Sequence, residues 1–269
     1  MPRISIKNQK KLLVKWVIAL AAVLVVMVCV ALLLRPAPPE PEPPTQPKTT
    51  YPTTSSDEFV YNDNGFLICT TRPSLPGIDV SHHQGVIDWE QVALAGVEFA
   101  MIRLAYRGYE DGALHEDEQA KRNLEQAKAA GLMIGGYVFS QAVSTEEAAE
   151  EAAFALEILA DTRLDLPLVY DWEYVSDSAR TAGVDSDTLM ACVNTFCAAV
   201  EAADMEPMVY FNQDLAKTKL KLKELDCPFW LAKYADNLNY AYPVRCWQYT
   251  DKGQIDGIDG YVDIDLYFL

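Results

Sequence analysis

The sequence predicts an α/β domain in which five strand–helix units and three closing strands form a barrel, preceded by a single transmembrane helix and a proline-rich linker. Short β-branched or aromatic runs alternate with longer helical patterns, which is typical of parallel βαβ units. The last three runs leave no room for helices between them. A barrel is the economical closure, because an open parallel sheet would leave an exposed edge. The predicted fold is therefore a TIM-barrel-like (β/α)5β3 barrel.

The first 35 residues differ from the rest of the chain. The nineteen residues from Trp16 to Leu34 carry no charge, about enough for a helix to cross a hydrocarbon core of roughly 30 Å. Five Lys or Arg residues precede this segment and Arg35 alone follows it closely, which favours an N-terminus inside the cell. A cleaved signal peptide, which would release a secreted domain, is the alternative, although no A-x-A cleavage site is present. We expect residues 1–35 to form a cytoplasmic tail and a retained signal anchor.

Residues 36–73 are predicted to be an extracellular linker. Eight of the 17 residues from Pro36 to Pro52 are proline. This composition favours an extended polyproline II spacer of about 50 Å, at about 3.1 Å per residue. Residues 74–269 then provide enough chain for one domain with a sizeable core.

The predicted domain is strongly acidic. From Ser74 onward it has 34 Asp and Glu against 14 Lys and Arg, a net charge of −20. Because affinity for nucleic acids depends on Lys and Arg that neutralise phosphates, we expect no nucleic-acid partner. Solubility alone is a sufficient explanation of the charge.

The elements of the barrel follow from hydrophobic runs and their flanking signals. The predicted strands cover residues 77–80, 98–105, 132–140, 166–174, 205–211, 228–234, 244–250 and 261–268. The predicted helices begin at residue 88 and then cover residues 115–130, 144–159, 186–203 and 213–222. Ser144 or Thr145 is expected to cap the third helix, whose first turn is acidic.

Acidic side chains gather where the active site of a βα barrel lies, at the carboxyl ends of the strands. Asp79 ends the first strand, Asp171 and Glu173 come near the end of the fourth, and Asp263 and Asp265 lie on the last. Aromatic residues are expected at the same ends: Tyr137, Phe139, Tyr210, Trp230, Tyr234, Trp247 and Tyr249.

Asp171 and Glu173 suit the cleavage of a glycosidic bond. Side chains two apart on a strand share a face, about 6.5–7 Å apart. In a barrel mouth, repulsion and partial burial would raise one of the two pKa values and leave a protonated acid beside an ionised partner. Glycoside hydrolysis needs a proton for the leaving oxygen and negative charge beside an oxocarbenium-like centre.

Each of these residues also has a structural explanation when taken singly. A D-x-E pair is common on strands, Asp79 is compatible with a helix cap, and Asp263 and Asp265 with solvated strand positions. The aromatic residues are compatible with a core. The convergence of acids from distant parts of the chain favours a site.

Several motifs resemble one known family. They are GIDVSHHQGVIDW (77–89), MIRLAYRG, GYVFSQA, LVYDWE, FWLAKYAD and WQYTDKGQIDGIDGYVDIDLYF. Together, in order from Gly77 to Phe268, they resemble the glycoside hydrolase family 25 muramidases, the Chalaropsis-type lysozymes. The resemblance implies a barrel of five βα units plus three strands, in agreement with the count above. It also implies hydrolysis of the β-1,4 bond between N-acetylmuramic acid and N-acetylglucosamine in peptidoglycan, with net retention.

The resemblance assigns roles to the acids. Glu173 matches the general acid, and Asp171 matches its partner, either the nucleophile or the group that orients the substrate's 2-acetamido group. Asp79 and Asp263 match the remaining catalytic carboxylates, with Asp265 in a place where the family pattern has Asn. The residues implied to contact the glycan are Tyr137, Phe139, Tyr210, Trp230, Tyr234, Gln248 and Asp265.

Two positions depart from the family pattern. Many members carry a K-x-T-E-G-like stretch after the second strand, where this chain has RLAYRGYEDG. Glu110 is displaced from the position of that glutamate, so we expect it to have no catalytic role. The family often has His or Tyr at Phe139, a difference expected to alter contacts to the glycan.

We expect neither a metal nor a cofactor. His82 and His83 are adjacent on a turn and cannot easily converge on one ion, and no cysteine is near in sequence. Cys192 and Cys197 are expected to be small core residues. Among the exported cysteines the disulfide pattern is open, and Cys227 and Cys246, near adjacent late strands, are the first pair to check.

These observations predict a membrane-anchored extracellular N-acetylmuramidase. Its partners would be peptidoglycan glycan strands and, through the N-terminal helix, the cell membrane. We expect the catalytic domain to be monomeric. Two alternatives are open: a catalytically silent peptidoglycan-binding module, against which the retained Asp79, Asp171, Glu173 and Asp263 argue, and a glycosidase acting on chitin-like polymers.

Overall fold

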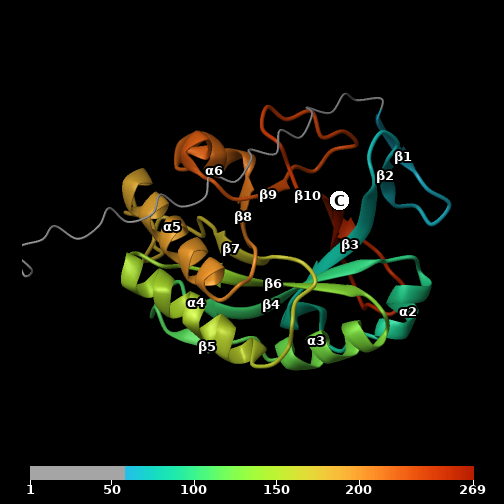
Figure 1. The fold of residues 1–269 in the computed structure, drawn as a ribbon, viewed down its shortest axis with the longest axis horizontal. Coiled ribbons are helices and arrows are strands. Elements are labelled where there is room, and N and C mark those ends of the chain that lie inside the picture. Colours follow the sequence, from blue (N-terminus) through green and yellow to red (C-terminus); the bar gives the residue numbers. More distant parts are fainter. Residues whose placement is uncertain (1–57) are drawn as a thin grey trace, which may run out of the picture. The chain divides into compact units, whose positions relative to one another are not determined.

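A computed structural model of the chain describes residues 58–269 and contains the predicted barrel (Figure 1). Within this range eight strands close into a ring, because the first of them, β3, pairs with both β4 and β11. Around the ring the strands are β3 (Ser74–Val80), β4 (Phe99–Arg107), β6 (Met133–Ser140), β7 (Leu168–Trp172), β8 (Pro207–Asn212), β9 (Phe229–Ala232), β10 (Cys246–Gly253) and β11 (Val262–Phe268).

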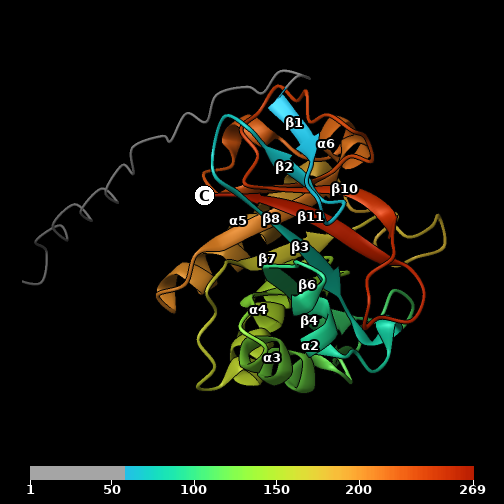
Figure 2. The same ribbon diagram turned by 90° about the vertical axis from the view of Figure 1, so that its right-hand side faces the viewer.

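Helices follow the first five barrel strands and lie outside the barrel (Figures 1 and 2). They are α2 (Trp89–Leu94), α3 (Ala120–Ala129), α4 (Thr145–Leu159), α5 (Ser186–Ala202) and α6 (Gln213–Thr218), with short 3-10 turns η2 (His82–Gln84) and η3 (Leu222–Glu224). Neighbouring barrel strands are parallel except for β11, which is antiparallel to both β10 and β3. The (β/α)5β3 order expected from the sequence is confirmed in these residues.

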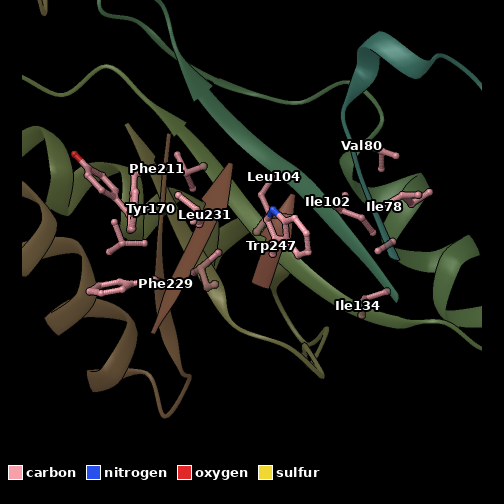
Figure 3. Close-up of a cluster of buried hydrophobic side chains, with 14 of the residues drawn as sticks. Ile78, Val80, Ile102, Leu104, Ile134, Tyr170, Phe211, Phe229, Leu231 and Trp247 are labelled. Atoms are coloured by element: carbon pink, nitrogen blue, oxygen red, sulfur yellow. The ribbon is translucent and has the colours of Figure 1, made fainter. Parts of the chain in front are cut away.

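Strand alternation separates two apolar clusters. One cluster faces the helices and includes Ile78, Ile102 and Trp247, as Figure 3 shows. The other fills the barrel interior with side chains such as Phe99 and Met101. The interior is filled so closely that a Cβ added at Gly77 would come within 2.3 Å of the Phe99 ring. The apolar packing thus occupies the lower interior, below the carboxyl ends of the strands.

The helix expected over residues 115–130 is shorter than predicted. The chain first forms β5 (Leu114–Glu116), an antiparallel strand on the edge of β4, and α3 begins only at Ala120. Asp117 accounts for the break. Its carboxylate accepts the backbone N–H of Gln119 at 2.9 Å and the Nε–H of Arg103 at 2.8 Å, which ties this turn to β4. Tertiary contacts therefore override a helical sequence pattern.

A short hairpin extends the folded region into the range predicted to be linker. Strands β1 (Phe59–Tyr61) and β2 (Leu67–Cys69) are antiparallel and precede β3. The Phe59 ring lies 5.0 Å from that of Trp247, and the Leu67 N–H donates to the Tyr249 hydroxyl at 3.2 Å. The boundary expected at residue 74 is therefore too late, because apolar residues of this hairpin join the outer cluster.

The predicted anchor over residues 16–34 and the proline-rich stretch lie outside the described residues. Among residues 58–269, none of the helices is long and apolar enough to cross a membrane.

Candidate active site

The predicted acids and aromatics surround a pocket of about 280 Å³ at the carboxyl ends of the barrel strands. Every residue assigned a catalytic or glycan-contact role from the sequence lines it, except Asp265. These residues are Asp79, Tyr137, Phe139, Asp171, Glu173, Tyr210, Trp230, Tyr234, Gln248 and Asp263. The barrel rule and strand alternation thus brought together residues from seven of the strands and from positions just beyond strand ends.

The catalytic candidates come from three places in the ring. Asp79 on β3 lies directly opposite Asp263 on the antiparallel neighbour β11. Asp171 lies in β7, and Glu173 follows one residue after that strand ends. Asp171 and Glu173 both line the pocket, as expected from their spacing.

A hydrogen-bond network joins four of the residues that line the pocket. The Gln248 amide donates to Asp79 Oδ2 at 2.7 Å. Its carbonyl oxygen accepts the hydroxyls of Tyr210 and Tyr234, each at 3.1 Å. Gln248 therefore fixes the Asp79 carboxyl group and two aromatic rings with one side chain.

Asp265 does not line the pocket, contrary to expectation. It is fully buried and accepts the Trp230 indole N–H at 2.7 Å. Both Asp263 and Asp265 face inward, but β11 runs antiparallel to β3, so its later residues lie deeper. Asp265 is opposite Gly77, whereas Asp263 is opposite Asp79. Asp265 therefore supports Trp230 from below.

Burial gives these carboxyl groups unusual affinity for protons. Burial, followed by the charge of Asp263, raises the pKa of Glu173 to about 7. Burial and the charge of Glu173 raise the pKa of Asp171 well above its usual range, while Arg103 opposes that rise. Burial also raises the pKa of Asp263 to about 6, with the charge of Asp251 contributing. The Asp171–Glu173 pair therefore holds at least one proton near neutral pH.

Asp171 has an unused acceptor. Its Oδ1 is buried and has no hydrogen-bond partner in the described part of the chain. Leaving a buried carboxylate oxygen unpaired is costly, of the order of 1–3 kcal/mol. Such an atom is suited to accept an N–H from a bound molecule.

The sequence reasoning missed four lining residues: Ser81, His83, Gln84 and Arg103. Arg103 is two residues after the interior Met101, so alternation along β4 offered a signal for it. The Ser81 hydroxyl accepts the His83 N–H at 3.2 Å and the Gln84 side chain accepts the Ser81 N–H at 2.9 Å. Asp79 was recognised, but the turn that follows it was not recognised as part of the wall.

Other sequence expectations have mixed outcomes. Glu110 lies exposed in the turn between β4 and β5, outside the pocket. Trp247 and Tyr249 pack in the outer cluster instead of at the site.

Cys227 and Cys246, the first pair to check for a disulfide, are both free in this structure. Cys246 lies inside the barrel, where Trp230 and Tyr267 belong to the same cluster. Cys227 lies outside it, and a hydrogen bond from its thiol to the neighbouring Cys197, together with burial, raises the pKa of Cys227. Cys192 and Cys197 are buried core residues, as predicted.

Comparisons with known proteins agree with the fold. A family model described as "Glycosyl hydrolases family 25" matches residues 78–258. Protein YegX of Escherichia coli strain K12 is 30% identical over 200 residues, which cover 72% of this chain and 70% of YegX. Lysozyme M1 of Streptomyces globisporus is 28% identical over 198 residues, which cover 70% of this chain and 65% of that enzyme.

A solved structure shows the same fold over most of this chain. The modular autolysin LytC of Streptococcus pneumoniae, solved in complex with a synthetic peptidoglycan ligand, is 27% identical with a TM-score of 0.66. The match covers 78% of this chain and 50% of LytC, so this chain spans about half of that protein. On the family match, the relatives and the shared fold, the chain belongs to the glycosyl hydrolases of family 25 and is a glycoside hydrolase of the muramidase type.

Proposed function

We propose that this protein is a membrane-anchored extracellular muramidase that cleaves the β-1,4 bond between N-acetylmuramic acid and N-acetylglucosamine in peptidoglycan. The observation that carries the proposal is the Asp171–Glu173 pair, which retains a proton near neutral pH inside a pocket walled by aromatic rings. Membership of the family and the autolytic and lysozyme relatives support the choice of substrate.

Glu173 is assigned as the general acid. At neutral pH its raised pKa leaves a large fraction protonated, so it can donate to the leaving oxygen and then accept a proton from the attacking water. Its position beyond the end of β7 leaves it partly accessible, as proton exchange requires.

Asp171 is assigned as the partner on the same side. Its unpaired Oδ1 supports an interaction with the N–H of the substrate's acetamido group, whose oxygen would then attack the anomeric carbon. Direct attack by Asp171 on that carbon is the other route. Either route gives net retention.

Asp79 and Asp263 are assigned to the opposite wall, where the charge of Asp263 would stabilise the oxocarbenium-like transition state. Burial and the charges of Asp263 and Asp265 raise the pKa of Asp79 well above its usual range, so Asp79 is assigned a role in holding the substrate by hydrogen bonds. Gln248 holds Asp79, and Tyr210 and Tyr234 hold Gln248. Tyr234 is 55% exposed, which supports its assignment as a platform for a sugar ring at the rim.

The decisive experiment is a digest of purified peptidoglycan with the full chain in detergent, followed by analysis of the new reducing ends. We expect muramic acid at those ends. New ends on chitin oligomers alone would indicate a chitin-type glycosidase, and glycan binding without new ends would indicate a silent module.

The anchoring is tested separately in intact cells. We expect an externally added protease to remove the domain from the cell surface, while the N-terminal fragment stays in the membrane fraction. Recovery of the intact domain in the medium would instead indicate a cleaved signal peptide.

A further inference from the structure

The backbone at Glu173 lies beyond the ladder that holds the rest of β7. The last paired residues of β6 and β7 are Ser140 and Trp172. Gln141 and Glu173 are the next residues after β6 and β7, where continued strand pairing would join them. Instead, the Gln141 side-chain amide donates to the Glu173 carbonyl oxygen at 2.7 Å. A side-chain hydrogen bond thus replaces the next backbone hydrogen bond between the two strands.

The Gln141 amide has all of its hydrogen-bonding groups engaged. Its second N–H donates to the Ser140 carbonyl at 2.9 Å, and its oxygen accepts the Thr181 hydroxyl at 2.9 Å. The side chain is fully buried. A primary amide supplies two donors and one acceptor in one plane, so these three bonds fix its orientation.

The ion pair between Arg180 and Glu147 holds the Gln141 backbone in place. Arg180 donates to the Gln141 carbonyl oxygen at 2.7 Å and to both carboxylate oxygens of Glu147, at 2.7 and 2.6 Å. Glu147 lies in the first turn of α4 and accepts the Val143 N–H at 2.9 Å. The same helix is capped by Ser144, one of the two caps expected from the sequence.

The β7–α5 loop is therefore tied at both ends to the β6–α4 loop. Gln141 holds its first residue, Glu173, and binds Thr181 near its other end. The Arg180 backbone N–H also donates to the Tyr109 carbonyl at 3.0 Å, which adds the turn after β4. Three loops at the carboxyl end of the barrel thus share one polar network.

We propose that Gln141 is a positioning residue that sets the direction in which the Glu173 side chain enters the pocket, with Arg180 and Glu147 holding Gln141 in place. The inference rests on the proposed role of Glu173 as general acid. A misplacement of about 1 Å at a reacting group can cost on the order of 100-fold in rate. Support of this kind is most needed where a catalytic group lies beyond regular structure.

The test replaces the amide by a side chain of similar length without hydrogen bonds, Gln141→Met. On peptidoglycan we expect kcat to fall about 10- to 100-fold, with KM within about twofold, because the acid is misdirected while the sugar subsites remain. On an aryl glycoside of the same disaccharide, whose phenol leaves without help from an acid, the loss should be less than about threefold. Thr181→Val, which removes one of the three bonds, should act in the same direction but more weakly, and it remains informative if Gln141→Met folds poorly.

Asn123→Leu is the matched control. Asn123 is another fully buried amide, on α3, whose oxygen accepts the Trp89 indole N–H at 3.3 Å, outside the pocket. This variant should lose thermal stability without changing the ratio of the two activities. Wild-type kcat in Gln141→Met, or equal losses on both substrates, would overturn the positioning role.

A second measurement separates this inference from the proposed function. The carboxyl carbon of Glu173, followed by NMR during a pH titration, reports its surroundings without any turnover. We expect its titration curve to change in Gln141→Met and to stay unchanged in Asn123→Leu. An unchanged curve in Gln141→Met would contradict the inference, whereas a wild-type protein that releases no reducing ends would contradict the proposed function alone.

Discussion

Buried acids near the carboxyl end of this barrel form two groups that differ in their charged neighbours. On the buried face of α4, Glu151 is fully buried and accepts the Arg107 Nε–H at 2.7 Å. The same guanidinium also donates to the Gly112 and Glu147 carbonyl oxygens, at 2.9 and 3.0 Å. In the pocket, Asp171 is also buried, but Arg103, whose charge lowers its pKa, forms its ion pair with Asp117 instead, at 2.8 Å. Glu151 Oε2 and Asp171 Oδ1 both have no hydrogen-bond partner among the described residues, so the two acids differ in their cation.

The difference teaches that charge compensation, more than burial, separates the structural acid Glu151 from the acids of the candidate site. Burial raises the pKa of Glu151 to about 6, although hydrogen bonds to Ser140 and Arg107 oppose it. Burial raises the pKa of Glu173 to about 7, and the next largest cause there is another acid, Asp263. An acid whose nearest charged neighbours are negative destabilises the folded state when it is ionised. Binding of a proton or of a substrate removes this repulsion.

The largest expected effect is on catalysis. Glu173→Gln removes the proton donor and leaves the shape of the side chain, so kcat on peptidoglycan should fall about 10²- to 10⁴-fold. Thermal unfolding should be unchanged or shifted upward, because the variant removes a carboxyl group that is crowded by others. Activity within tenfold of the wild type would remove Glu173 from the role of acid.

The next effect is on stability. Arg107→Met should lower the free energy of unfolding by about 3–5 kcal/mol, because it leaves Glu151 buried without its cation. The rate per folded molecule should stay within a few-fold of wild type. Denaturant titration measures the loss, and Lys121→Met is the control, because Lys121 pairs with Glu116 on the exposed surface at 2.9 Å and should matter by less than about 1 kcal/mol.

The pH dependence sharpens the comparison further. The folded pKa of Glu173, about 7, lies above the ordinary value of 4.5, so the folded protein keeps this proton at pH values where the unfolded chain has released it. The contribution of Glu173 to stability is therefore fully present below about pH 4.5 and is lost as pH rises through 7. Each pH unit over which the folded state holds one extra proton changes the free energy of unfolding by about 1.4 kcal/mol. The protein should therefore be more stable at pH 5 than at pH 8, and kcat should decline above pH 7.

Glu173→Gln is the control for this pH dependence. It should flatten the decrease in stability between pH 5 and pH 8, leaving the part due to the other pocket acids, such as Asp263. An identical slope in the variant and the wild type would mean that Glu173 titrates normally.

The smallest expected effect belongs to an acid outside both groups. Glu110 is exposed in a turn and does not line the pocket. Glu110→Gln should leave kcat within about twofold and the free energy of unfolding within about 0.5 kcal/mol. A tenfold loss of kcat would show that this turn reaches the substrate.

The barrel and most of its site were predictable because both depend on local periodicity. Strand alternation assigns inward positions, and the barrel rule assigns the end at which Asp79, Asp171 and Glu173 meet. The exceptions all involve contacts between distant segments. The β1–β2 hairpin is too short to be recognised without Trp247 and Tyr249, and the late start of α3 depends on Asp117 binding Arg103.

The sequence by itself determined the order of elements, the family resemblance and the identity of the acids. Each of these depends only on residue types and on short spacings along the chain. Tertiary structure alone decided how deeply each acid is buried and which residues it contacts. It places Asp265 below the pocket and joins Gln141 to the Glu173 backbone. It also pairs Arg107 with Glu151, whereas Asp171 Oδ1 has no hydrogen-bond partner among the described residues. The physical reason is that a pKa depends on burial and on neighbouring charges, and in this protein those neighbours come from strands far apart in the chain.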